Sequence, residues 1–363
     1  MSQWRIRGME ETFFELLRYS IGASDKMRHL SDEEWQTIYE MAKKQSLIGI
    51  VFAGIKRLPA DLLPPKKTKL TFYALAGKIT QRNTVVNQTA VAVSAHFQEA
   101  GYDNCILKGP GNAQMYPNPG ARTTGDIDIW LDGEIKQIVK LARQKVPHTK
   151  ACYHHVDFGK YKGVEIEIHY RPAYINNLIC NGRMQRWFRQ MAHEQMMHRI
   201  ALQPSSEEIS VPTNAFNRIF QMAHISNHVI QEGIGLRQLL DYYYLLMQGF
   251  SEEEKLNDER LLRRFGLYHV ASAVMYVLRE IFGLPEGQMI VPVDERRGQF
   301  LLEEIMIAGN FGKYDKRLEG YHSGIAKNIS RLKRDVRFLR YFPSECLWEP
   351  IFRIYHFFWR ISH

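Results

Sequence analysis

The sequence predicts an α/β protein, an α+β arrangement in which a short strand-rich segment lies between two helical regions. Short apolar runs bounded by glycines over residues 102–172 read as strands, whereas capping signals and proline breaks delimit helices on either side. At 363 residues and 45% hydrophobic content, the chain can build two or three compact units with ample core. We expect an N-terminal helical region at 1–100, a central core at 101–205 and a C-terminal helical domain at 206–363.

The helices have recognisable start and stop signals. Ser31-Asp32-Glu33-Glu34 is a capping box that opens a helix running to about Lys43. After the break at Pro64-Pro65, residues 66–100 form one or two helices that end at Gly101. Further helices are expected at 183–200 and from Thr213 to the end, with a loop at Pro204-Ser205-Ser206 between them.

A glycine-rich turn follows the first predicted strand, in Leu107-Lys108-Gly109-Pro110-Gly111-Asn112-Ala113. Gly109 and Gly111 let the main chain approach a ligand closely, and successive N–H groups before a helix can bind an anion. Lys108 and Arg122 add positive charge, and an arginine can hold a phosphate through two donors. The turn is neither a Walker loop nor a dinucleotide fingerprint, because both patterns are incomplete.

Two carboxylates interrupt the apolar run Gly125-Asp126-Ile127-Asp128-Ile129-Trp130-Leu131. In a strand, Asp126 and Asp128 point to the same side because side chains alternate with period two. Neighbouring like charges disfavour a strand unless something offsets their repulsion. Magnesium does so directly, since it takes carboxylate, phosphate and water oxygens. The alternative is a solvated strand face.

A hairpin is expected next, with its strands at 151–158 and 163–170 and its turn around Gly159-Lys160-Tyr161-Lys162-Gly163. On the second strand, Glu165, Glu167 and His169 share one face, opposite three apolar residues. This polar face suits the lining of a site or a fully solvated surface.

Two helical pairs lie in the C-terminal part. His224 and His228 are four residues apart and share a helix face, without the glutamate of a zinc-protease motif. An isolated pair of this kind is more often a packing or surface feature, and of the two functional alternatives we favour contact with a substrate across the domain cleft over zinc binding. Arg237 and Asp241 have the same spacing, which allows an intrahelical ion pair worth about 0.3–0.5 kcal/mol.

Taken together, these motifs resemble the uncharacterised nucleotidyltransferases of the polymerase-β-like superfamily. The resemblance spans roughly residues 100 to 245 and rests on Leu107-Lys108-Gly109, Tyr116-Pro117, Arg122-x-x-Gly125-Asp126-Ile127-Asp128, Glu165-Ile166-Glu167-Ile168-His169-Tyr170-Arg171 and Gly235-Leu236-Arg237-Gln238-Leu239-Leu240-Asp241. It implies a nucleotidyltransferase core with a small mixed sheet, flanked by the two helical regions. The chain departs from the family at the phosphate turn, where Lys108-Gly109-Pro110-Gly111 replaces Gly-Gly or Gly-Ser.

The resemblance also implies a reaction: an acceptor hydroxyl takes a nucleoside monophosphate from an NTP and pyrophosphate leaves. Asp126, Asp128 and Glu167 would be catalytic and would hold two Mg²⁺ or Mn²⁺ ions, with Glu165 as the runner-up to Glu167. Arg237 would face the nucleotide phosphates or base. The nucleotide-binding residues would be Lys108, Gly109, Gly111, Arg122, Gly125 and Arg237. Further candidates for the site are Glu165, His169, His224, His228 and Asp241.

Two other functions stay open: a module that binds nucleotides without turnover, and a toxin-like enzyme that modifies tRNA or a protein. We favour a small-molecule acceptor, and no motif names it. The widely spaced cysteines fit a reducing cytosol better than a disulfide or zinc framework: Cys105, Cys152, Cys180 and Cys346. An acidic N-terminal segment argues against a signal peptide, and no apolar run reaches the length of a membrane span. We therefore expect a cytoplasmic protein, with its oligomeric state open.

The net charge of +9 is unevenly placed, because basic residues outnumber acidic ones in the aromatic-rich stretch 324–363. Such a stretch can bind nucleic acid or an anionic membrane. We favour a packed terminal segment whose aromatics join the core while Arg and Lys cover the rim.

Overall fold

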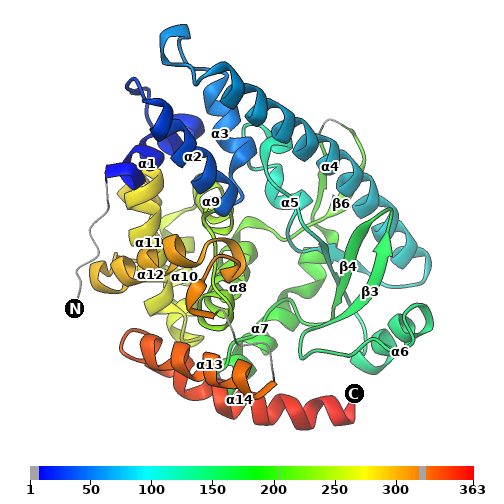
Figure 1. Ribbon diagram of the computed structural model, residues 1–363. Coiled ribbons are helices and arrows are strands. Elements are labelled where there is room, and N and C mark those ends of the chain that lie inside the picture. The colour runs from blue at the N-terminus through cyan, green and yellow to red at the C-terminus, as the bar shows by residue number, and fades with distance from the viewer. Residues whose placement is uncertain (1–7, 204, 319–323) are drawn as a thin grey trace.

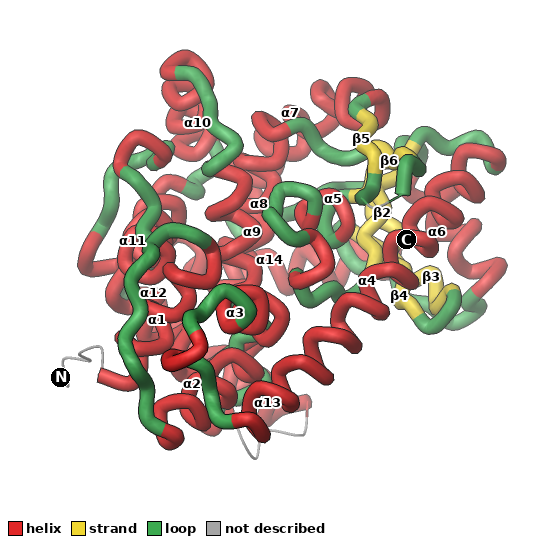
Figure 2. The backbone as a smooth tube through the Cα atoms, turned by 90° about the horizontal axis from the view of Figure 1, so that it is seen from above, coloured by secondary structure: helices red, strands yellow, loops and turns green. Residues whose placement is uncertain are grey.

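The computed structural model describes residues 8–203, 205–318 and 324–363 as a mostly helical molecule with a small sheet at one side (Figure 1). Figure 2 shows the strands gathered in one part of the molecule, with helices on both sides of them. The predicted α/β fold class, a small mixed sheet flanked by helical regions, is confirmed. The domain boundaries proposed from the sequence stay predictions.

The described elements follow the chain in this order. The helices are α1 (Gly8–Ile21), α2 (Asp32–Lys44), α3 (Ile48–Ile55), α4 (Lys66–Glu99), α5 (Pro110–Ala113), α6 (Ile135–Lys145), α7 (Leu178–Met197), α8 (Asn214–Gln231), α9 (Leu236–Leu246), α10 (Glu252–Arg264), α11 (Tyr268–Phe282), α12 (Glu295–Ala308), α13 (Gly324–Leu339) and α14 (Pro343–Ser362). The strands are β1 (Asn104–Ile106), β2 (Ile127–Leu131), β3 (His155–Tyr161), β4 (Val164–His169), β5 (Arg199–Ala201) and β6 (Glu208–Ser210).

The main sheet has the order β1-β2-β4-β3 and is mixed, because β2 and β4 are parallel while the other two pairs are antiparallel. In the parallel pair, Asp128 lies directly opposite Glu167. Residues in register on neighbouring strands point to the same side of a sheet. The topology therefore places carboxylates from two distant sequence segments side by side.

Side chains on the two faces of β2 point alternately into the hydrophobic core and toward the site. Ile127 and Ile129 join a buried cluster with residues of α4 and α6, whereas Trp130 stacks on Phe216 of α8 with ring centroids 5.9 Å apart. Asp128 shares the Trp130 side of the strand. Its carboxylate thus faces the junction between the sheet and the C-terminal helices.

Several element boundaries agree with the sequence analysis. Helix α2 has the predicted capping box, in which Ser31 and Glu34 each accept a hydrogen bond from the other's backbone N–H. Residues 66–99 form a single helix. The hairpin turn is shorter than expected, because β3 continues to Tyr161 and only Lys162 and Gly163, both with positive φ, separate it from β4.

The helix expected at 183–200 has different bounds. It begins at Leu178, where the Asn177 side chain accepts hydrogen bonds from the N–H groups of Ile179 and Cys180. It ends at Met197, and Arg199–Ala201 instead pairs with Glu208–Ser210 in a two-stranded sheet. That pairing depends on a tertiary partner, which the local pattern does not contain.

The C-terminal stretch folds into α13 and α14, which lie side by side along one edge of the molecule (Figure 1). Phe338, Phe342, Phe352 and Trp359 are buried, as the packing interpretation predicts. In the part of the chain that the structure describes, no helix combines the length and apolarity that a membrane crossing requires.

Candidate functional site

Three carboxylates converge where β2 and β4 lie side by side. Oxygen atoms of Asp126, Asp128 and Glu167 all lie within 4.8 Å of one another. Asp128 and Glu167 meet through the strand register, and Asp126 immediately precedes β2. The structure thus brings together the trio that the sequence analysis selected.

Lys108 and His169 supply the positive charge next to this trio. Lys108 Nζ and His169 Nε2 each lie 2.9 Å from Asp128 Oδ1, and His169 Nε2 lies 3.6 Å from Glu167 Oε2. Burial opposes the imidazolium, but the hydrogen bonds to Asp128 and Glu167 outweigh it and raise the pKa of His169 to about 9. The histidine is therefore a cation at neutral pH.

The two aspartates respond differently to this environment. Burial opposes the charged form of Asp128, but Lys108 and His169 hold its pKa well below the usual range. Repulsion from Asp128, together with burial, raises the pKa of Asp126. Two cations thus leave part of the negative charge uncompensated. A cluster of hard carboxylate oxygens with excess negative charge fits a divalent cation such as Mg²⁺.

The trio lies in the wall of a cavity of about 910 Å³. The sheet side of the cavity includes Lys108, Gly109, Gly125 and His169, and the opposite walls come from α8, α9, the segment near Phe311, and the α13–α14 pair. A cavity of this size falls within the range of small-molecule sites. The C-terminal helices therefore form part of the same cavity as the carboxylates.

The two glycines of the predicted phosphate turn have different roles. Gly109 lines the cavity and has φ of 61°, a conformation that favours glycine. Gly111 faces away, and a Cβ there would lie only 2.9 Å from a methyl group of Val211. Gly111 thus permits close packing, while the neighbouring Asn112 lines the cavity.

Arg122 and Asp241 form a second buried cluster. Arg122 donates through Nε and Nη2 to the two oxygens of Asp241, at 2.7 and 2.6 Å, and the Tyr116 hydroxyl donates to the same carboxylate at 2.6 Å. Burial opposes ionisation of Asp241, but Arg122 lowers its pKa. Two of the three Arg122 nitrogens are thus committed to Asp241, and only Nη1 is left to contact a phosphate.

The intrahelical pair of Arg237 and Asp241 allowed by their spacing is wrong, because Asp241 pairs with Arg122. Arg237 instead donates from Nη1 to the Thr123 carbonyl oxygen at 2.8 Å, and its buried Nε has no partner. Its side chain lines the cavity. Arg237 thus retains a donor for a ligand.

His224 and His228 lie on the cavity wall opposite the sheet. His224 Nε2 is 3.3 Å from Lys108 Nζ and 3.0 Å from His228 Nε2. Burial, reinforced by the charge of Lys108, holds the pKa of His224 well below its usual range. The pair thus joins Lys108 to the helical side of the cavity. Whether it contacts substrate stays a prediction.

Glu165, the runner-up to Glu167, points outward. It is exposed and pairs with Lys160 at 3.0 Å, outside the cavity lining. Both glutamates share a strand face, but Glu167 opposes Asp128 of β2 while Glu165 opposes Lys160 of the edge strand β3.

Sequence reasoning missed several residues around the site. His155 Nδ1 lies 3.8 Å from Glu167 Oε2, and His155, Glu167 and His169 form a second group with metal-ligand geometry. Asn83 of α4 donates to the carbonyl oxygens of Gly120 and Arg122, both at 2.9 Å, and so fixes the loop before β2. The adjacent histidines at 154 and 155 are visible in the sequence as candidate site residues. No sequence pattern singles out Asn83.

Comparisons with known proteins identify the family of the chain. The model of a family described as uncharacterised nucleotidyltransferase matches residues 31–283. No curated protein matches. A nucleotidyltransferase-like antigenic protein from Paracoccidioides brasiliensis is similar at 12% identity over 52% of this chain and 91% of its own, with a TM-score of 0.29, too distant to bear on the fold. Because the family match covers more than half of the chain, the protein belongs to the uncharacterised nucleotidyltransferase family.

Proposed function

We propose that the protein transfers a nucleoside monophosphate from an NTP to an acceptor hydroxyl and releases pyrophosphate. The observation that carries this proposal is the cluster of Asp126, Asp128 and Glu167 in the wall of a large cavity. These carboxylates would hold Mg²⁺ or Mn²⁺, with two ions expected. When bound there, the ions supply neutralisation of the charge on the triphosphate and on the departing pyrophosphate.

The chain's own residues would orient the reactants. Lys108 and the Gly109 backbone line one side of the trio and provide positive charge and a close main-chain approach for phosphate oxygens. Arg237, at the start of α9, lines the same cavity and adds a further positive charge. Gly125 also lines the cavity, and because it has no side chain it leaves room for the ligand beside the main chain. Positioning and charge neutralisation of this kind supply much of the catalysis in phosphoryl transfer generally.

Glu167 is placed to receive the proton of the acceptor hydroxyl. It is half-buried, and His169 on one side and His155 on the other lie within 3.8 Å of its Oε2 atom. Burial opposes its ionisation, but the hydrogen bond from His169 lowers the pKa of Glu167. Glu167 is thus ionised at neutral pH, and in that form it can accept a proton or ligate a cation.

Titration calorimetry with ATP, with and without Mg²⁺, tests the nucleotide site. Wild type should bind ATP in a Mg²⁺-dependent way, and Asp126→Asn/Asp128→Asn should weaken that binding by at least about 100-fold, since two ligands lose their charge. Unchanged Mg²⁺-dependent binding in the double variant would contradict the assignment.

Glu165→Gln is the matched control, because it removes a carboxylate from the same strand face but outside the cavity. Pyrophosphate release measured with a panel of hydroxyl acceptors then separates transfer from binding alone. Release that requires both an acceptor and an intact Asp126–Asp128 pair supports the transferase. ATP binding without release across the panel favours a nucleotide-sensing module.

A further inference from the structure

Phe311 occupies an unusual backbone conformation in the cavity wall. Its φ and ψ are 53° and 36°, in the left-handed region, and its side chain lines the same cavity as the carboxylates. A bulky residue at positive φ is uncommon, because its Cβ comes too close to the following carbonyl oxygen. Such conformations persist only where the surroundings enforce them, and they concentrate at ligand sites.

The surroundings of Phe311 enforce its conformation. Gly309 and Gly312 on either side also have positive φ, and a Cβ at Gly312 would lie 2.1 Å from the carbonyl oxygen of Glu232. Asn310 donates to the Ser46 hydroxyl at 3.0 Å. The segment is thus pressed against the end of α8 and the start of α9, and the Phe311 ring has a fixed position at the cavity.

The neighbours of the ring connect it with the phosphate side of the cavity. The Phe311 ring centroid lies 5.2 Å from that of His228 and 5.8 Å from the guanidinium carbon of Arg237. The positive charge of Arg237 in turn interacts with the negative charge of Asp126. An aromatic ring beside an arginine with an unused donor suits a flat heterocycle that carries hydrogen-bond acceptors.

We propose that Phe311 and Arg237 form the subsite for the nucleobase of the bound NTP. This inference rests on the proposed function, and it adds the position at which the base is held. The triphosphate would extend from this subsite past Arg237 toward the carboxylates. Stacking on Phe311 accepts any base, whereas the Arg237 Nε favours a base with an acceptor on its edge.

Calorimetry with Mg²⁺-ATP and with Mg²⁺-tripolyphosphate, which lacks a base, tests this subsite. Phe311→Ala should weaken ATP binding by about 5- to 150-fold, the range that loss of one stacked base gives. Tripolyphosphate binding should change less than about twofold, and Phe311→Tyr should retain ATP affinity. Tyr314→Ala, on the same segment but outside the cavity lining, is the control.

The outcomes separate the two proposals. If wild type binds both ligands and Phe311→Ala binds both equally well, or loses both equally, the base subsite is wrong and the proposed function stands. If wild type binds neither ligand, the proposed function fails and the subsite with it.

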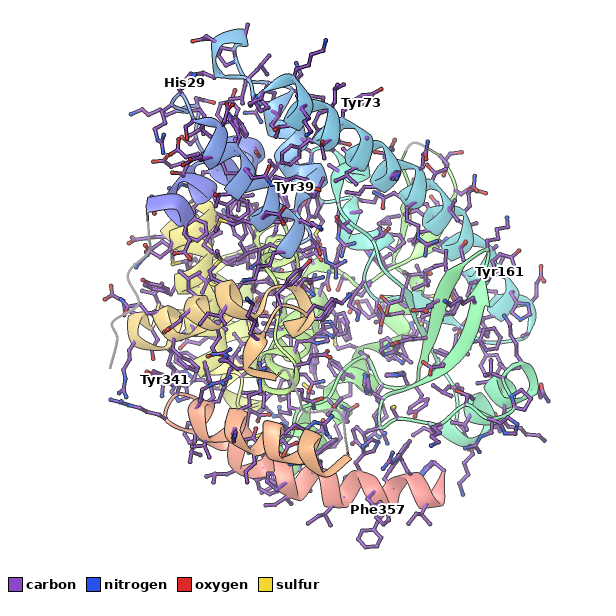
Figure 3. All side chains as sticks on the ribbon, in the orientation of Figure 1. His29, Tyr39, Tyr73, Tyr161, Tyr341 and Phe357 are labelled. Carbon is purple, nitrogen blue, oxygen red and sulfur yellow. The ribbon has the colours of Figure 1, made fainter. Side chains whose placement is uncertain are left out.

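A second observation, independent of the nucleotide site, concerns the outer face of α13 and α14. Figure 3 shows Phe357 projecting away from the body of the molecule. Large apolar side chains are exposed along both helices: Leu332, Val336 and Leu339 on α13, and Leu347, Ile351, Ile354, Phe358 and Ile361 on α14. We call these eight residues the outer stripe.

The spacing within the outer stripe is that of a coiled-coil seam. On α14 its members follow one another at intervals of four, three, four and three residues, and on α13 at four and three. Apolar residues at this spacing pack knobs-into-holes against another helix. Monomeric proteins seldom expose apolar patches larger than a few hundred Å².

The uncharged character of the outer stripe favours a second copy of this chain as the occupant. All eight of its members are apolar, and Arg353 and Arg360 of α14 line the cavity instead. An anionic partner would gain no ion pair from the stripe itself, whereas a second uncharged stripe matches it. Stable interfaces bury about 800 Å² per partner, an area of the order that eight large side chains supply.

We propose that two copies of the chain associate through their outer stripes, with the two hairpins forming a four-helix bundle. A twofold axis would make the contact self-complementary and closed. The proposal does not depend on any activity of the cavity.

Sedimentation equilibrium of the full chain tests this association. Wild type should have twice the 42.5 kDa chain mass, and Ile351→Glu/Phe358→Glu should have the mass of one chain. Leu256→Glu, which adds one glutamate at an exposed leucine of α10, should remain a dimer. A monomeric wild type overturns the proposal. So does flotation of wild type, but not of the double variant, with phosphatidylserine vesicles, because the stripe would then be a membrane surface.

Discussion

Two carboxylate clusters adjoin the same cavity, and their charges are balanced in opposite ways. Asp241 is satisfied by two donors of Arg122 and by the Tyr116 hydroxyl, all within 2.7 Å. Around Asp128, by contrast, three carboxylates share one lysine and one histidine. The first cluster holds the fold together, and the second keeps negative charge available for a cation.

The pKa values of Asp241 and Asp126 shift in opposite directions, in line with this difference in charge balance. The pKa of Asp241 is lowered, because Arg122 outweighs the effect of burial. The pKa of Asp126 is raised, chiefly by repulsion from Asp128. Removing a carboxylate should therefore cost stability in the first cluster and function in the second.

The largest expected effect on stability follows from Asp241→Asn. This change leaves the Arg122 guanidinium buried without a counter-charge, which typically costs about 3–5 kcal/mol. Urea unfolding monitored by circular dichroism would measure the loss. Asp126→Asn, its matched partner, should cost much less, because it also relieves repulsion from Asp128 and Glu167. The reverse order of the two losses would contradict the division of roles.

The carboxylate trio could be predicted from the sequence, whereas the Asp241 cluster could not. Strand alternation aligns Asp126 with Asp128, whereas the local pattern left the role of Glu167 open and only the family resemblance selected it. The partners Arg122 and Asp241 are 119 residues apart, and helical spacing suggested Arg237 instead.

Long-range packing explains the other features of the structure that the sequence did not predict. The strands β5 and β6 form only with each other, so the local sequence of 199–201 continued to resemble a helix. Phe311 enters the cavity because glycines on either side allow a left-handed turn, a feature that composition alone does not single out. The C-terminal helices line the cavity through tertiary packing, although their amphipathic character was visible in the sequence.

Mg²⁺ should stabilise the second cluster only. A cation at 100 times its dissociation constant raises the free energy of unfolding by about 2.7 kcal/mol. We expect this gain in wild type, its reversal by EDTA, and its absence in Asp126→Asn/Asp128→Asn, all measured by thermal unfolding at fixed ionic strength. Equal stabilisation of the double variant would place the cation elsewhere.

The contributions of Asp241 and Asp126 to the pH dependence of stability should have opposite signs. Because the pKa of Asp241 is lowered on folding, its contribution is present above the unfolded value of about 3.9 and is lost as the pH falls. Because the pKa of Asp126 is raised, its ionisation disfavours the folded state as the pH rises through the unfolded value.

Unfolding curves between pH 3 and pH 7 without metal would show the two signs. Asp241→Asn should be less stable than wild type at pH 7 and should approach it in acid. Asp126→Asn should be at least as stable as wild type at pH 7, and that difference should vanish in acid. Parallel pH profiles for the two variants would remove the electrostatic basis of the comparison.

Substitution of Glu165 should have the smallest effect on stability and on ATP binding, and it serves as the control for the other variants. Its ion pair with Lys160 is exposed, with side-chain exposures of 67% and 64%, and such pairs contribute about 0–1 kcal/mol. Glu165→Gln should therefore leave both the urea midpoint and Mg²⁺-dependent ATP binding close to wild type. Glu167→Gln, two residues along the same strand face, should keep the midpoint but lose most pyrophosphate release. Glu167 lies in register with Asp128 of β2, whereas Glu165 lies in register with Lys160 of β3, so equal behaviour would show that strand register does not create the site.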